Sequence, residues 1–244
     1  MIQLSVARAE THCARVRLLI IVLFVVLCGA NPVAAQEVTI LESDVYFRPT
    51  SQASWRRVTN LGDVRTAVPS PGIHLIAFVR NTPGDSVETG MGKVVASELW
   101  VAGVDGSGAR RLLHGRNATP SMRVLGDLAN LVFSPDERQV FFTSAEAVTS
   151  LAVHAADIQS GTERFICPGT LKAVVPTGKY AGDIIVNQHR YFLLGGSYDW
   201  LWLITPNGKE VGPLGEARED IDGIVAQLDA IPVSRRDTTG HHSQ

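Results

Sequence analysis

The sequence predicts an all-β fold of repeated hairpins, and three observations lead to this prediction. An apolar–turn–apolar unit recurs along the chain, most clearly at residues 131–142. A second hairpin follows each copy, and its first strand begins at Leu99, Leu151 and Leu201, at intervals of 52 and 50 residues. Asp-Gly and Asn-Gly pairs separate the apolar runs in two of these hairpins, and such pairs are the strongest short-range hairpin signal.

The unit at residues 131–142 has the order strand, tight turn, strand. Pro135 fixes φ at the first turn position, and Asp136 can hydrogen-bond its own backbone to close the turn. A copy at residues 67–78 carries the same Ser-Pro pair 64 residues earlier. A weaker copy at residues 183–194 lacks Ser-Pro and keeps only the apolar–turn–apolar outline.

The second hairpins cover residues 99–113, 151–166 and 201–211, and a half copy at residues 45–59 begins 54 residues before the first of them. A repeat of about 40–50 residues with four strands is typical of a propeller blade. One such sheet cannot bury both of its faces alone, so neighbouring blades must stack against each other around an axis. The predicted fold is therefore an all-β propeller of few blades.

The Ser-Pro-Asp turn at residues 134–136 before an apolar strand resembles the blade motif of TolB-type propellers. The strand at residues 99–101, which leads through residues 105–108 into residues 110–112, resembles the same motif. These blades are also similar to those in the propeller domain of prolyl-oligopeptidase-type peptidases. The resemblance covers roughly residues 45–215. It implies protein–protein contacts, because TolB-type propellers serve as interaction platforms in the cell envelope.

Propellers of this family usually have roughly six or more blades, whereas this sequence contains three full units and one half unit. Two architectures stay open: a small closed ring of about four blades, or an open arc of three to four. A closed ring needs residues 38–41, or residues after about 217, to complete the half unit. Residues 224–228 fit either a short amphipathic helix or a closing strand. An open arc leaves unpaired strand edges that favour association, and a homodimer is then expected.

The first 35 residues are predicted to be a secretory signal peptide and not part of the fold. Three arginines precede the apolar run at residues 18–27, and small residues follow it. The run is shorter than the roughly 18–20 apolar residues of a membrane span, which argues against a transmembrane helix. An uncleaved N-terminal anchor is the alternative. The remaining chain divides into a propeller-type domain at residues 36–233 and a disordered polar tail at residues 234–244. We therefore expect a periplasmic or secreted protein, with no stable membrane insertion after signal removal.

Charge and cysteine content narrow the function classes further. Removing the signal segment takes away three arginines and one glutamate and leaves a net charge of −4. We therefore expect no binding to nucleic acid or to an anionic membrane. Cys13 and Cys28 lie in the signal segment, so Cys167 alone remains and an intramolecular disulfide cannot form. Cys167 itself is expected at a half-buried strand end.

Residues 195–199, Gly-Gly-Ser-Tyr-Asp, nearly match the G-x-S-x-G nucleophile turn, and the peptidases with similar propellers carry a Gly-Gly-Ser-Tyr-Gly elbow. Such an elbow needs a helix after the serine and Gly at the fifth place. Here Asp199 takes the fifth place, and a strand-like run at residues 200–205 follows. A triad also needs a later histidine, but His241 and His242 lie in the tail. Residues 195–199 are therefore expected to form an inter-strand turn.

The other histidines of the domain are scattered without ligand spacing, and His74 and His189 are expected in turns. Residues 105–108 lack the further carboxylates of a calcium site and are expected to form a hairpin turn. Residues 81–96 are expected to be a long edge loop, with a binding loop as the alternative. The three later tryptophans, Trp100, Trp200 and Trp202, alternate with apolar strand residues and are expected mostly in the core.

These features predict an exported, non-catalytic, TolB-like propeller that acts as a protein-binding platform in the cell envelope. The alternative is a propeller remnant of a prolyl-oligopeptidase-type peptidase, which recognises or gates substrate beside a separate catalytic partner. An enzyme that uses the axial channel is a third hypothesis. The sequence assigns no catalytic, cofactor-binding or metal-binding residue and no cofactor, and the expected partner is another protein.

Overall fold

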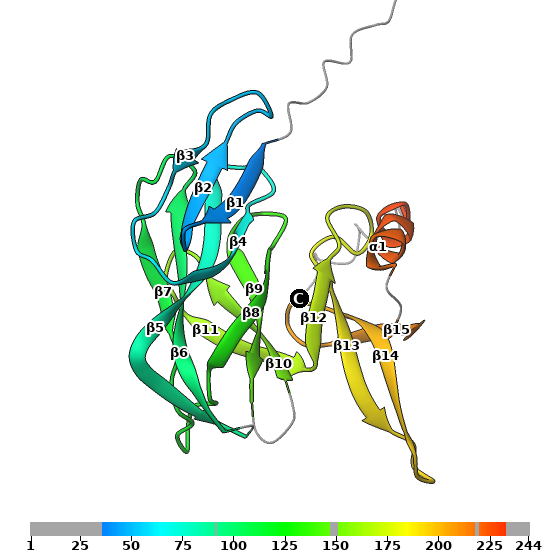
Figure 1. Ribbon diagram of the computed structural model, residues 1–244. Helices are drawn as coiled ribbons and strands as arrows, with labels where there is room; N and C mark the ends of the chain where they lie inside the picture. Colours follow the sequence, from blue (N-terminus) through cyan, green and yellow to red (C-terminus); the bar gives the residue numbers. More distant parts are fainter. Residues whose placement is uncertain (1–35, 91, 147–150, 218–219, 233–244) are drawn as a thin grey trace, which may run out of the picture. The chain divides into compact units, whose positions relative to one another are not determined.

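The computed structural model describes residues 36–90, 92–146, 151–217 and 220–232, which form four antiparallel sheets and then a helix (Figure 1). The first sheet, in the order β1-β2-β3, contains β1 (Glu37–Leu41), β2 (Asp44–Arg48) and β3 (Arg56–Arg57). The second sheet contains, in chain order, β4 (Val64–Pro69), β5 (Leu75–Thr89), β6 (Gly92–Gly103) and β7 (Arg110–His114). The third contains β8 (Gly126–Phe133), β9 (Gln139–Ala145), β10 (Leu151–Asp157) and β11 (Glu163–Pro168). The fourth contains β12 (Thr170–Val174), β13 (Ile184–Tyr191), β14 (Ser197–Ile204) and β15 (Glu210–Glu216), and α1 (Ile221–Asp229) follows.

The Ser-Pro turns form as predicted and explain the start of the following strand. Ser134 Oγ donates to Asp136 Oδ1 at 2.6 Å and accepts a hydrogen bond from the main-chain N–H of Gln139 at 3.0 Å. In the upstream copy Ser70 Oγ accepts from the N–H of Leu75 at 3.1 Å. In both copies the serine therefore binds the first residue of the second strand, which sets the hairpin register.

The predicted third copy of this unit is wrong. Residues 184–191 form the single strand β13, so His189 lies in a strand and not in a turn. The first strand of this sheet is β12, which the sequence pattern did not predict as a strand. The turn between β12 and β13 spans residues 175–183. The polar residues 187–190 do not mark a turn, because the outer half of β13 extends beyond the buried core and leaves His189 exposed.

Two further expectations are corrected or decided by the structure. Residues 81–96 are not a loop, because β5 and β6 continue through them as a hairpin in which Val87 and Ala96 are buried with Val124. Residues 224–228 belong to the helix α1 and not to a closing strand. The helix begins after Asp220, whose side chain accepts a hydrogen bond from the N–H of Gly223 at 2.9 Å.

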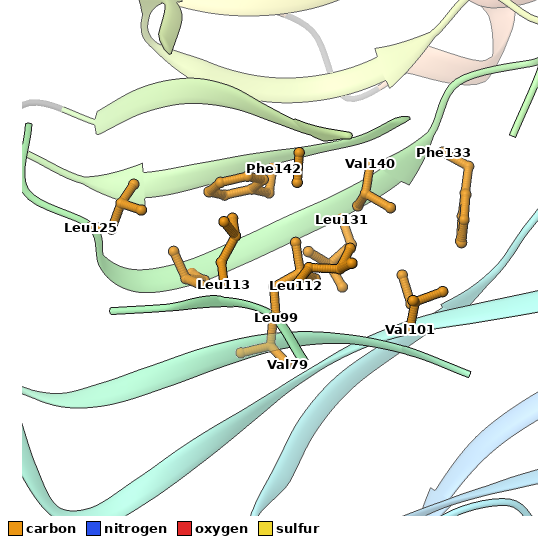
Figure 2. Packing of buried hydrophobic residues seen from close by; sticks show 13 residues of the cluster. Val79, Leu99, Val101, Leu112, Leu113, Leu125, Leu131, Phe133, Val140 and Phe142 are labelled. Carbon is orange, nitrogen blue, oxygen red and sulfur yellow. The ribbon is translucent and has the colours of Figure 1, made fainter. Parts of the chain in front are cut away.

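Neighbouring sheets share hydrophobic clusters. The second and third sheets enclose a cluster that includes the fully buried Leu99, Val140 and Phe142 (Figure 2). Other clusters join the first sheet to the second, the third to the fourth, and the fourth to α1, where Leu228 is buried. Among the described residues, no cluster combines the first and fourth sheets. Within the described residues, the clusters therefore link only sheets that are consecutive along the chain.

An arginine on the outer strand of each of the first three sheets also contacts the next sheet. Each guanidinium donates to a main-chain carbonyl oxygen, and the arginines recur every 54 residues. The contacts are Arg56 to Val104 at 2.8 Å, Arg110 to Ile158, and Arg164 to Pro206 at 2.6 Å.

A turn glycine lies beside each of these contacts. A Cβ added at Gly106, Gly161 or Gly208 would lie 3.0, 3.1 or 2.7 Å from a carbonyl oxygen of the preceding sheet. All three glycines also have positive φ, at 85°, 72° and 85°. The positive φ and the close approach of the preceding sheet therefore both favour glycine at the repeated sheet-to-sheet junction.

Candidate functional site: the β13–β14 hairpin

The β13–β14 hairpin changes character along its length. Its inner half contains Ile184, Ile185 and Leu203, which are buried against the third sheet or against α1. The two strands remain paired from Ile184 opposite Ile204 to Tyr191 opposite Ser197. The buried half therefore anchors an outer half that extends beyond β12 toward solvent (Figure 1).

The turn of this hairpin exposes four consecutive large apolar side chains, which we call the apolar tip: Tyr191, Phe192, Leu193 and Leu194. Their exposed fractions are 77%, 55%, 104% and 102%, respectively. Isolated exposed apolar residues are ordinary, but four in succession form a contiguous patch, and such patches mark interaction sites.

Two glycines build the turn behind the apolar tip. The N–H of Phe192 donates to the carbonyl oxygen of Gly196 at 3.0 Å, and the N–H of Gly195 donates back to Phe192 at 3.1 Å. Gly195 and Gly196 have φ values of 99° and 85°, a region that side chains with a Cβ rarely adopt. The Gly-Gly pair therefore closes the turn and leaves Leu193 and Leu194 projecting from it.

Aromatic rings support the apolar tip. The Phe192 ring lies 4.6 Å from that of Tyr198, centroid to centroid, and Tyr198 contacts Trp200 edge-to-face at 5.2 Å. On the opposite strand His189 contacts Tyr191 edge-to-face at 5.1 Å. These ring contacts restrict the rotamers at the tip, which lowers the entropy cost of binding through it.

The charged groups below the apolar tip are paired with each other. His189 Nδ1 lies 3.1 Å from Asp199 Oδ1. Arg190 forms an ion pair with Glu210, and its guanidinium lies over the Trp202 ring, 3.6 Å from the centroid. The apolar tip therefore lies above an ion-paired arginine and a hydrogen-bonded carboxylate.

A groove of about 730 Å³ lies beside the hairpin, between β11 and β13. Its lining includes Cys167, Gln188 and Arg190. Gln188 Nε2 donates to the carbonyl oxygen of Pro168 at 2.7 Å, which ties the two sheets together. Cys167 is buried near the end of β11, where half-burial was expected, and burial raises the pKa of its thiol to about 12. The thiol is protonated at neutral pH and is a poor nucleophile there.

The structure places the near-match to a nucleophile turn in this same hairpin. Ser197 is the first residue of β14 and is exposed, and a strand follows it instead of a helix. The predicted inter-strand turn is present, but it spans residues 192–196, and residues 197–199 already belong to β14. Residues 105–108 likewise form a hairpin turn, in which Asp105 Oδ1 accepts from the N–H of Ser107 at 2.9 Å. His241 and His242 lie outside the described residues.

The tryptophans fit the predicted core only partly. Trp100 and Trp202 pack, half-buried, against clusters between sheets, whereas Trp200 belongs to the aromatic row below the apolar tip. In the described ranges, no group of three or more His, Cys, Asp or Glu side chains could hold a metal ion. No helix within the same ranges is long and apolar enough to cross a membrane. The predicted signal peptide lies outside them.

Sequence reasoning missed the apolar tip because it assigned residues 191–194 to a buried strand. The signal that identifies it is the Gly-Gly pair that follows directly. Four large apolar residues that run into Gly195-Gly196 have no room for a polar turn, so some of them must occupy the turn themselves.

A scan of protein-family models and a search of curated proteins found no significant match. Solved structures do match. The chain is similar to dipeptidyl peptidase 4 from Porphyromonas gingivalis, with 9% identity and a TM-score of 0.51 over 75% of this chain and 31% of that one. The β-propeller domain of the Trilobed protease from Pyrococcus furiosus matches at 14% identity and a TM-score of 0.46, over 74% of this chain and 53% of that one. Putative TolB from Agrobacterium tumefaciens matches at 14% identity and a TM-score of 0.46, over 75% of this chain and 58% of that one.

The fold is that of a β-propeller. Four consecutive antiparallel sheets that pack through their faces, together with the likeness to dipeptidyl peptidase 4, confirm the predicted class at the level of fold. A TolB structure and a peptidase propeller are among the matches, as the resemblance in the sequence predicted. The chain spans little more than half of the Trilobed protease propeller and of the TolB structure, at 53% and 58% of their lengths. At these identities the likeness describes the fold alone.

Proposed function

We propose that this β-propeller is an exported, non-catalytic binding protein that attaches to another protein through the apolar tip at residues 191–194. The proposal rests on one observation, the exposure of Leu193 and Leu194 at 104% and 102% on a hairpin whose inner half is buried. Burying a Leu, Phe or Tyr side chain stabilises a complex by roughly 1.5–3 kcal/mol. Tyrosine, which the apolar tip provides at Tyr191, is also enriched among the hot spots of protein interfaces.

The neighbouring charges support a protein pocket as the receptor. Arg190 and Glu210 neutralise each other, so Arg190 is not free to bind a polyanion. The chain also carries a net charge of −2 overall. Electrostatic attraction therefore contributes little, and binding depends on burial of the four side chains.

The test replaces Leu193 with a photo-crosslinking amino acid in the natural host and places the same group at Val95 as the control. Val95 is also an exposed apolar residue, at 51%, but lies on β6 in the second sheet. We expect one main protein adduct from position 193 and none from position 95. Equal adducts from both positions would contradict the proposal.

Binding to the purified adduct partner then gives the second measurement. Leu193→Ser with Leu194→Ser should weaken binding at least about tenfold, since two apolar anchors are lost, while Val95→Ser leaves it unchanged. Both variants alter exposed side chains, so their melting temperatures should match the parent protein. A hydrolase as the partner would favour the alternative, a propeller that recognises substrate for a separate peptidase. A Ser197→Ala variant with altered turnover of an ester or peptide would contradict the non-catalytic assignment.

A further inference from the structure

The first sheet differs from the other three in its strand number. It contains β1, β2 and β3, whereas each of the following sheets contains four strands. The 54-residue repeat identifies which strand is missing. Asp44 and Arg57 form an ion pair of 2.5 Å that joins β2 to the residues of β3, and Glu98 and Arg111 form the equivalent pair of 2.7 Å between β6 and β7. The strands β2 and β3 therefore correspond to the third and fourth strands of a complete sheet.

By the same correspondence β1 is a second strand, equivalent to β5, β9 and β13. In the other sheets a first strand, β4, β8 or β12, pairs with the far side of that second strand. In the first sheet, no strand of the described residues pairs with β1 on the side away from β2. Among the described strands, none therefore occupies the first-strand position beside β1, which we call the slot.

Specific main-chain groups face this slot. A two-residue turn at Glu42 and Ser43, with φ of 49° and 63°, joins β1 to β2. In such a hairpin the flanking pair, Leu41 and Asp44, exchanges hydrogen bonds, and bonding then alternates along the ladder. The N–H and C=O groups of Val38 and Ile40 therefore point away from β2, into the slot. No hydrogen bond to these groups is present among the described residues.

We propose that this edge of β1 binds an extended segment of a partner protein, which adds as the fourth strand of the first sheet. The main chain of the incoming segment satisfies the groups of Val38 and Ile40, as in other cases of strand addition. The side chains of Val38 and Ile40 pack toward the second sheet, so the segment must carry small apolar or β-branched residues on that face. The chain's own first strand β4 carries the β-branched Val68 on the equivalent face, toward the third sheet.

This site is separate from the apolar tip, since β1 belongs to the first sheet and the tip to the fourth. The proposal therefore does not depend on the proposed function, and variants of Leu193 leave it unaffected. The edge of β1 would recognise its ligand through main-chain hydrogen bonds and through every second side chain, whereas the apolar tip would insert its own side chains into a pocket of the partner.

Hydrogen exchange of the purified, dilute protein followed by NMR provides the test. In the isolated protein the amides of Val38 and Ile40 should exchange faster than those of Thr39 and Leu41, which bond β2. The probe is a capped peptide of residues 63–70, which copies β4. We expect it to slow exchange at Val38 and Ile40 by at least about tenfold, because each amide gains a hydrogen bond. The same peptide with proline at Thr66 and Val68 should have no effect.

A matched pair of variants separates edge binding from loss of fold. Ile40→Pro removes a donor that does not bond β2, a position at which edge strands tolerate proline, and should weaken the peptide about tenfold. Leu193→Ser should leave peptide binding unchanged. If Ile40→Pro fails to fold, hydrogen exchange of the unaltered protein with the peptide still tests the proposal.

Three outcomes would overturn the proposal. Slow exchange at Val38 and Ile40 in the isolated monomer would mean that the chain fills its own slot. Protection that rises with protein concentration, without peptide, would assign the slot to a second copy. Peptide binding that leaves both amides unprotected would place the ligand elsewhere.

Discussion

Arg164 Nη1 donates a hydrogen bond to the main-chain oxygen of Pro206 at 2.6 Å, and this contact joins the third sheet to the fourth. The second guanidinium nitrogen binds Gln139 Oε1 at 3.0 Å. The arginine therefore adds a polar link between the two sheets to that of Gln188 with Pro168. Arg56 and Arg110 occupy the equivalent positions at the two earlier junctions.

The first prediction concerns this junction. Arg164→Met keeps the apolar stem but removes both hydrogen bonds, so the free energy of unfolding should fall by about 1–3 kcal/mol. Urea denaturation followed by tryptophan fluorescence measures it. The control is Arg138→Met, at an exposed turn position, which should change stability by no more than about 0.5 kcal/mol. Equal losses from both variants would show that the Arg164 contact contributes nothing.

A second prediction tests the close approach at the same junction. Gly208→Ala adds a Cβ that would lie 2.7 Å from the carbonyl oxygen of Ile166, at a φ of 85°. Gly195→Ala carries a similar backbone strain, with φ at 99°, but its Cβ meets nothing within 4 Å. We therefore expect Gly208→Ala to lower the free energy of unfolding by about 1–3 kcal/mol more than Gly195→Ala does. Calorimetry of the two variants gives the comparison, and matching values would exclude a steric clash at Gly208.

A third prediction follows from Asp183, at the start of β13. Burial raises the pKa of this carboxyl to about 6. Between pH values of about 4 and about 6, the unfolded chain loses the proton while the folded protein keeps it, so this group lowers stability as the pH rises through that window. Above a pH of about 6, the destabilisation caused by the buried Asp183 carboxylate is constant.

Asp183→Asn removes this penalty. Its free energy of unfolding relative to the parent protein should grow from pH of about 4 to about 6 and then remain level. Denaturant titrations at several pH values measure the difference. A difference that stays flat across this range would mean that Asp183 titrates normally in the folded protein.

A fourth prediction concerns Cys167. Burial raises the pKa of its thiol to about 12, so little thiolate exists at neutral pH and the side chain is also inaccessible. Alkylation of Cys167, followed by mass spectrometry of its peptide, should be slow in buffer and fast in denaturant. Rapid modification of the folded protein would instead indicate that the groove beside β11 opens readily to solvent.

The chain's local chemistry predicted the hairpins that a few residues specify. Ser134 and Asp136 close their turn through contacts within five residues, and the Asn207-Gly208 turn supplies the positive φ that its geometry needs. The turn predicted within residues 183–194 is wrong, because the polar residues there belong to β13: His189 is exposed, whereas Gln188 is buried and hydrogen-bonded to Pro168. The continuation of β5 and β6 through residues 81–96 was missed for a related reason, since burial of Val87 depends on the distant Val124.

By itself, the sequence determined the repeat, its strand-rich class and the turns, because each depends on periodic patterns and contacts between near neighbours. Only the three-dimensional packing shows which sheets share a core, that residues 221–229 cover the fourth sheet as a helix, and that no described strand pairs with the outer side of β1. It also decided that Leu193 and Leu194 face solvent. Residue type by itself does not distinguish an apolar side chain that is buried from one that is exposed. Only the position of segments far apart along the chain determines which of the two occurs.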